Sequence, residues 1–115
     1  MERIMVPTAP AELIDKLTIL RLKSQRIYDP AKLSNIRHEQ QILMRTAEDH
    51  LPTDDDLATL WEDLYQINAR LWVIEDDIRA CEACGDFGPA FIDLARAVYV
   101  TNDKRAEVKK KINTL

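Results

Sequence analysis

The stretch LATLWEDLYQINARLWVIEDDIRACEACG, residues 57–85, carries the most regular apolar pattern in the chain. Its apolar positions alternate steps of three and four residues without a miss. They are Leu57, Leu60, Leu64, Ile67, Leu71, Ile74, Ile78 and Cys81. This spacing places them on one side of an α-helix and is typical of the heptad seam along which long helices pack. Gly85 suits the end of such a helix, so the pattern predicts a long helix over residues 54–84.

The chain before this stretch is predicted to form two helices, residues 10–28 and 30–50. In the first, apolar side chains follow steps of four and three, and Thr8 is a candidate N-cap. The pair Asp29 and Pro30 marks the start of the second, because Asp caps helices well and Pro suits the first helical position.

The chain after the long helix is predicted to form one more helix, residues 89–113. Its three-four spacing keeps one phase from Phe91 onward, which favours a single helix although Asn102 and Asp103 could break it. The short connection before it predicts an antiparallel hairpin with the long helix. The expected fold is all-α: an antiparallel bundle of about four helices in a single domain, residues 1–115.

The composition argues against several classes of function. The chain has only two glycines, which disfavours an all-β fold, and its formal charge of −4 does not resemble the basic footprint of a nucleic-acid-binding protein. No window approaches the roughly 18 apolar residues of a membrane span, and the N-terminus lacks a signal-peptide pattern. We therefore expect a cytoplasmic protein with reduced thiols and without nucleic-acid or membrane partners.

The length of the third helix indicates how the chain associates. A helix of about 31 residues is about 46 Å long, so its hairpin is expected to project beyond the two shorter helices. A heptad seam exposed there favours pairing with a second copy as a coiled coil. We expect a homodimer.

Charged residues interrupt the apolar pattern at one level of the hairpin. A second stripe on the long helix is aromatic at first and becomes charged at Glu75 and Arg79, which are correctly spaced for an ion pair. Folding the hairpin at its turn brings Glu75 opposite Asn102, within about one turn of Arg105. Unpaired buried charges cost several kcal/mol, so these groups should meet. The predicted polar cluster consists of Glu75, Arg79, Asn102, Asp103 and Arg105.

The predicted cluster has two interpretations. It is an internal network that fixes helix register, or a ligand site in which two Arg side chains hold a carboxylate or phosphate. The same carboxylate and Arg side chains could also serve acid–base catalysis, and no feature of the sequence distinguishes catalysis from binding. Metal-dependent hydrolysis needs two groups of carboxylates that hold the metal. Only Glu12 and Asp15 have the spacing of one such group, so half of the pattern is present. No catalytic residue, cofactor or metal ligand is assigned.

Cys81 and Cys84 form a CxxC motif with three interpretations. Zinc would need two further ligands, and redox pairs lie at helix N-termini, whereas this pair lies at a predicted C-terminus. Cys81 also occupies a position of the apolar seam, which favours a packing role.

Three segments occur in order over nearly the whole chain: VPTAPAELIDKLTILRLKSQRIYDPAKLSNIRHE, LWVIEDDIR and FIDLARAVYVTNDKRAEVKKKIN. Together they resemble a family of small all-helical bacterial and phage proteins, a domain of unknown function. The resemblance implies no activity, substrate or cofactor. It implies shared polar positions at Glu12, Asp15, Lys16, Lys23, Glu75, Asp76, Arg79, Asn102, Asp103 and Arg105.

The expected function is a non-enzymatic helical binding or interaction module that forms oligomers. The alternative is a protein or enzyme that binds an anionic small molecule at a polar cluster between the third and fourth helices. The candidate ligand-binding residues are Glu75, Arg79, Asn102, Asp103, Arg105, Asp15 and Lys16.

Overall fold

The fold is all-α, as predicted, and consists of four helices. The computed structural model describes residues 1–115. Its helices are α1 (Pro10–Arg26), α2 (Pro30–His50), α3 (Asp55–Ala83) and α4 (Pro89–Asn113). The predicted bounds are confirmed to within two residues. α4 runs through Asn102 and Asp103 without a break, as the constant phase of its apolar positions predicted.

The N-terminus of α1 is capped from the far end of the chain rather than by its own flank. Thr8 was predicted as the cap, but the N-cap residue is Ala9 and no neighbouring side chain accepts a hydrogen bond there. Instead, the side-chain oxygen of Asn113, at the end of α4, accepts from the backbone N–H of Ala11 at 2.9 Å. The first turn of α1 therefore depends on the last turn of α4.

The starts of α2 and α3 use Asp side chains. Asp29 accepts from the N–H of Ala31, as predicted. The cap of α3 is Asp54, whose carboxylate accepts from two backbone N–H groups and places negative charge at the positive end of the helix.

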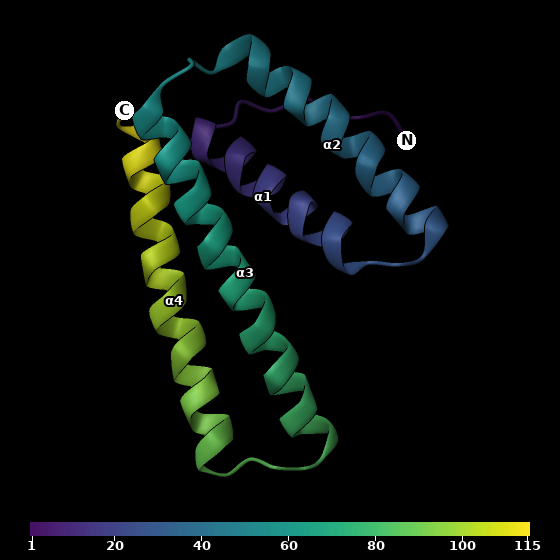
Figure 1. Ribbon diagram of the computed structural model, residues 1–115, viewed down its shortest axis with the longest axis vertical. Helices are drawn as coiled ribbons and strands as arrows, with labels where there is room; N and C mark the ends of the chain where they lie inside the picture. The colour runs from purple at the N-terminus through teal and green to yellow at the C-terminus, as the bar shows by residue number, and fades with distance from the viewer.

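The C-terminus of α3 ends in a Schellman motif. Gly85 has a φ of +68°, and its N–H donates to the carbonyl of Glu82 while the N–H of Asp86 donates to the carbonyl of Cys81. The chain can therefore turn sharply into α4, and α3 and α4 form the expected antiparallel hairpin (Figure 1).

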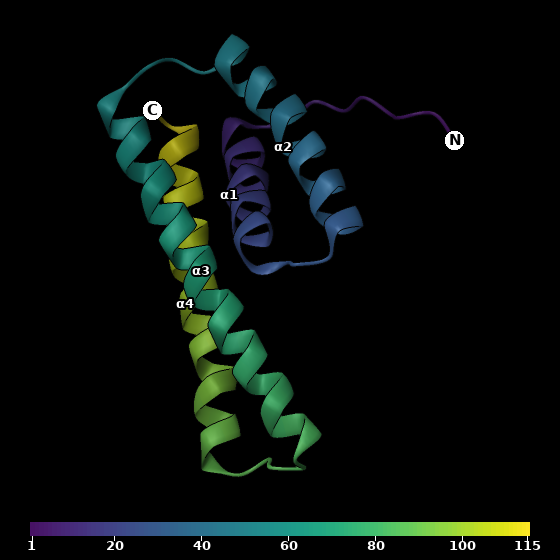
Figure 2. The ribbon, with the colours of Figure 1, turned by 45° about the vertical axis from the view of Figure 1, so that its right-hand side comes forward.

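α1 is the central element of the arrangement. It packs against α2, α3 and α4, whereas α2 contacts only α1 (Figure 2). Accordingly α1 is buried from two sides. The face toward the hairpin carries Ala11 and Ile14, which join Leu57, Leu64 and Ile112 in the core.

The hairpin extends far beyond α1 (Figure 1). α1 has 17 residues and α3 has 29, which correspond to about 25 Å and about 43 Å. Every buried residue of α3 lies at or before Ile74, and every buried residue of α4 lies at or after Thr101. We call residues 75–100 the distal hairpin. The remainder of α3 and α4, together with α1, is the proximal junction.

Two further features bear on the expectations from the sequence. None of the four helices combines the length and hydropathy that crossing a bilayer requires. Cys81 is half-buried and Cys84 is exposed, and both are free thiols.

Candidate functional site

The best-defined polar site lies in the proximal junction around Asp15 of α1. The Asp15 side chain is 7% exposed and projects between α3 and α4. Its Oδ1 accepts hydrogen bonds from Nδ2 of Asn68 at 2.8 Å and from Nε of Arg105 at 3.2 Å. Its Oδ2 accepts from Nη2 of Arg105 and lies 3.6 Å from Nζ of Lys109. One carboxylate thus joins three helices.

Thr18 completes this polar centre, which we define as Asp15, Thr18, Asn68, Arg105 and Lys109. The Asn68 amide also donates to Oγ1 of Thr18 at 2.8 Å, and the Thr18 hydroxyl donates to the backbone carbonyl of Asp15 at 2.7 Å. No buried side-chain nitrogen or oxygen in the protein lacks a hydrogen-bond partner. The polar centre therefore avoids the penalty of unsatisfied buried groups.

The electrostatics of the centre hold Asp15 in its ionised form. Burial alone would raise the pKa of Asp15, because it disfavours charge. Hydrogen bonds from Arg105 and Asn68, with the charges of Arg105 and Lys109, outweigh burial and lower the pKa below its ordinary value. A carboxyl group with a lowered pKa is a poor proton donor near neutral pH.

The charges of the centre are balanced within the chain. Lys109 also binds Glu12 at 2.8 Å, so two carboxylates and two cationic side chains meet at the α1–α4 contact. Asp15 is the acceptor for both cations, and its oxygens are occupied. This arrangement fixes the position of α1 on the hairpin.

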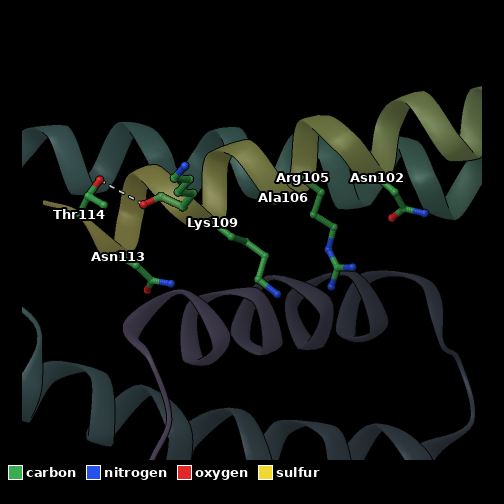
Figure 3. Close-up of a pocket in the computed structure, with 7 residues that line it drawn as sticks. Asn102, Arg105, Ala106, Lys109, Asn113 and Thr114 are labelled. Carbon is green, nitrogen blue, oxygen red and sulfur yellow. Dashed lines mark hydrogen bonds between the residues drawn. The ribbon is translucent and has the colours of Figure 1, made fainter.

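A groove opens beside the polar centre along the C-terminal half of α4. Its volume is about 510 Å³. Arg105 and Lys109 point from α4 toward α1 along it, as Figure 3 shows. It is lined by Asn102, Arg105, Ala106, Lys109, Lys110, Asn113 and Thr114. Because the Asn113 oxygen is bound to Ala11, its NH₂ group is left as a donor.

Comparison with protein families finds a match that covers nearly the whole chain. A model of a family of unknown function, DUF6165, matches residues 4–115. The chain belongs to this family. No curated protein and no solved structure is significantly similar to it. DUF6165 membership therefore assigns no activity, and the site must be interpreted from its own geometry.

Within this DUF6165 chain, some of the sequence-predicted site residues come together. Asp15 and Arg105 bind each other, and Asn102 lines the groove beside Arg105. Lys16 lies on another face of α1, where it pairs with Glu39 of α2 at 3.1 Å. The structure thus joins two of the predicted residues in the polar centre.

The prediction that Glu75 and Arg79 lie on a buried stripe is wrong. Glu75 is exposed, and Arg79 is 73% exposed and binds Asp76 at 3.3 Å rather than Glu75. Asp103 is also exposed and has no ion-pair partner. Arg105 binds α1 instead of meeting Glu75, so the predicted cluster between α3 and α4 does not form.

The physical reason is the length of α1. The second stripe of α3 does face α1 over its first half, where Arg21 lies 3.6 Å from the ring centroid of Tyr65 and Arg26 lies 5.9 Å from that of Trp72. α1 ends at Arg26, so the charged half of the stripe has no helix to face.

Three residues of the polar centre were not among the predicted site residues: Thr18, Asn68 and Lys109. A signal for α1 was present, because Ala11, Asp15, Thr18 and Leu22 follow steps of four, three and four. That spacing marks a second buried face on α1, with Asp15 and Thr18 in it. Asn68 lies among the aromatic residues of the α3 stripe that face α1.

Proposed function

We propose that this DUF6165 protein is a non-enzymatic helical interaction module that self-associates through its distal hairpin in the bacterial cytoplasm. One observation carries the proposal: the fully buried residues of the apolar seam all lie in the proximal junction, whereas the seam residues within 75–100 are only half-buried or less. Ile78 and Cys81 of α3, with Leu94 and Val98 of α4, are all partly exposed. A two-helix hairpin closes such a seam by packing against further helices, as in a four-helix bundle.

Exposed apolar side chains on the distal hairpin support the same function. Phe87 is 58% exposed, Ile92 52%, Tyr99 71% and Val100 50%. Single apolar residues on a surface are ordinary, but groups of them typically mark interaction surfaces. Ile92, Tyr99 and Val100 line one shallow depression on α4 together with Arg96.

The polar centre supports an interaction module over an enzyme. Its carboxylate is ionised, and its oxygens are occupied by Asn68, Arg105 and Lys109. A general base or nucleophile needs a free lone pair toward its substrate. In this proposal the centre holds α1 in place and the distal hairpin binds.

Sedimentation equilibrium of the full chain, from micromolar to near-millimolar concentration, tests the proposal. A concentration-dependent dimer is expected. Hydrogen exchange at both ends of this range should show added protection in residues 75–100 and unchanged protection in α1. A monomer at every concentration would refute self-association.

The N-terminal arm offers a matched control. Ile4 and Met5 are 82% and 90% exposed and lie outside the hairpin. Replacing both with Ser should leave the dimer intact. Loss of the dimer in that variant would move the interface from the hairpin to the arm.

Anion binding in the groove beside the polar centre is a second candidate function. It is favoured by the donors that face the groove, namely Lys110 and the NH₂ groups of Asn102 and Asn113. Thermal-shift measurements with phosphate, nucleotides and dicarboxylates would detect it. Lys110→Ala is the informative variant, because Lys110 makes no contact with Asp15. A stabilising ligand that binds this variant equally well would exclude the groove.

A further inference from the structure

The outer face of α4 is the least explained surface of the molecule. Both helices that contact α4, α1 and α3, lie on the side that carries Thr101, Arg105 and Ile112. The opposite side has no element next to it (Figure 1). A helix with one covered face is expected to carry polar residues on the other. α4 instead presents Ile92 and Tyr99 there, both more than half exposed.

These outer residues form a regular line. Ile92, Arg96, Tyr99 and Asp103 follow steps of four, three and four, and all four are exposed. At 100° per residue they lie within about 60° of one another on the helix, and about 180° from Thr101. Val100 widens the apolar part of the line on one side. We call Ile92, Arg96, Tyr99, Val100 and Asp103 the outer stripe.

The charges of the outer stripe have no partners in the chain. Neither Arg96 nor Asp103 takes part in any ion pair of the structure. They are seven residues apart, about 10.5 Å along the helix, which is too far for the three- and four-residue pairs that form within a helix. One positive and one negative charge therefore flank Tyr99, each without a partner.

The outer stripe is complementary in charge to the same stripe on an identical helix that runs in the opposite direction. In an antiparallel pair of identical helices related by a two-fold axis at Tyr99, Arg96 of one copy lies within about 1.5 Å, along the axis, of the level of Asp103 in the other. The same ion pair forms twice, once on each side of the axis. Ile92 then lies at the level of the partner's Ala106, which is small and exposed. Tyr99 packs at the centre, where aromatic anchors contribute most to binding.

We infer that α4 is the dimer interface: it pairs antiparallel with α4 of a second copy, centred on Tyr99 and bounded by two symmetric ion pairs between Arg96 and the partner's Asp103. This inference rests on the proposed self-association, identifies its partner and register, and places the contact on the outer face of α4 rather than on the half-buried seam. A contact between two helices over about four turns is smaller than a standard interface, so a weak dimer with micromolar affinity is expected. It weakens as salt screens the ion pairs.

Charge reversal in the 115-residue chain tests the inference. The dimer dissociation constant of Arg96→Asp, Asp103→Arg and the double variant is measured by sedimentation equilibrium. Each single reversal should weaken the dimer at least about tenfold, because two-fold symmetry makes every substitution act twice. The double variant restores both ion pairs with reversed sign and should return to within about threefold of the original. These side chains are exposed, so unchanged thermal unfolding verifies the fold of each variant.

Crosslinking gives an independent reading of the register. Both native cysteines are first replaced, by Cys81→Ser and Cys84→Ser. In this background Val100→Cys is treated with a short bismaleimide. Tyr99→Phe in the same background has no cysteine and serves as the reference that cannot crosslink. Val100 adjoins the proposed axis, so a covalent dimer is expected. Asp77→Cys, on the outer face of α3, is the matched control and should remain monomeric on denaturing gels.

The outcomes separate the interface from the proposed function. Rescue by the double charge reversal together with crosslinking at position 100 supports the α4 interface. A dimer that is unaffected by either single reversal, or that crosslinks through position 77 instead, overturns this interface while self-association stands. A wild-type chain that remains monomeric overturns both.

Discussion

The two halves of the α3–α4 hairpin have the same apolar spacing and different surroundings. In the proximal junction α1 covers the hairpin, and Leu57, Leu64, Leu71 and Ile74 of the seam are buried near a satisfied carboxylate, Asp15. In the distal hairpin no third helix covers α3 and α4, and the charged residues Glu75 and Arg79 are exposed. Helical periodicity therefore predicts which side of a helix packs, whereas the length of the neighbouring helix decides how far that packing extends.

The largest difference between the halves should appear when an apolar side chain is truncated. Leu64 is fully buried and Ile78 is half-buried. Leu64→Ala should lower the free energy of unfolding by about 3–4 kcal/mol, and Ile78→Ala by about 1 kcal/mol, because only the first leaves a cavity inside a packed core. Urea denaturation of dilute protein measures both. Equal losses would mean that the distal seam is packed as tightly as the proximal one.

Removing the charge of Asp15 should be the next largest effect. Asp15→Asn keeps the shape of the side chain but leaves Arg105 without a carboxylate and Lys109 with only that of Glu12. The free energy of unfolding should fall by about 2 kcal/mol, the size of one charged hydrogen bond or a little more. Glu75→Gln in the distal hairpin is the matched control and should change it by less than about 0.5 kcal/mol. A neutral Asp15→Asn would show that the polar centre contributes no net stability.

Acid should weaken the proximal junction before the distal hairpin. The folded-state pKa of Asp15 lies below its ordinary value of 3.8. The ionised form therefore contributes stability that is complete above about pH 4 and is lost as the pH falls through the folded-state pKa. Thermal melts across this range should show the loss, and Asp15→Asn should flatten it. Glu62 acts in the same direction, because a hydrogen bond from Arg21 lowers its pKa, so a small slope should remain.

The smallest effect concerns the turn at the distal end. Gly85 has a φ of +68°, and a methyl group placed on it would meet no atom within 4 Å. Gly85→Ala should therefore cost about 1 kcal/mol, entirely from the left-handed backbone conformation. Hydrogen exchange should locate the loss at the end of α3 and leave the proximal junction unchanged. Faster exchange in α1 would show that the two halves unfold together.

The sequence predicts the helices well because their signals are local. Three-four spacing, the Asp29 cap and Gly85 each act within a few residues, and the structure confirms all three. Asn68 of α3 and Arg105 of α4 both bind Asp15 of α1. Folding the hairpin on itself does not predict this meeting, because the shared carboxylate comes from α1.

The site could not be predicted in full because it depends on tertiary placement. Glu75 and Asn68 occupy the same stripe of α3, and no local property of the sequence separates them. Asn68 is buried because α1 contacts the first half of the stripe, and Glu75 is exposed because α1 ends before the second half. The role of Lys109, which binds Glu12 and approaches Asp15, depends on the placement of α1 in the same way.

The cap on α1 has a consequence for how the protein is made. Ala11 donates to Asn113, 102 residues further along the chain, and Asp15 binds Arg105 across 90 residues. A ribosome that adds 5–20 residues per second completes these partners about 4 to 17 s after it completes α1. During that time α1 can pack against α2 and then α3, but the carboxylate of Asp15 lacks Arg105 and Lys109. The nascent chain therefore carries this carboxylate without its cationic partners, and its native core is complete only when the last turn of α4 has left the ribosome.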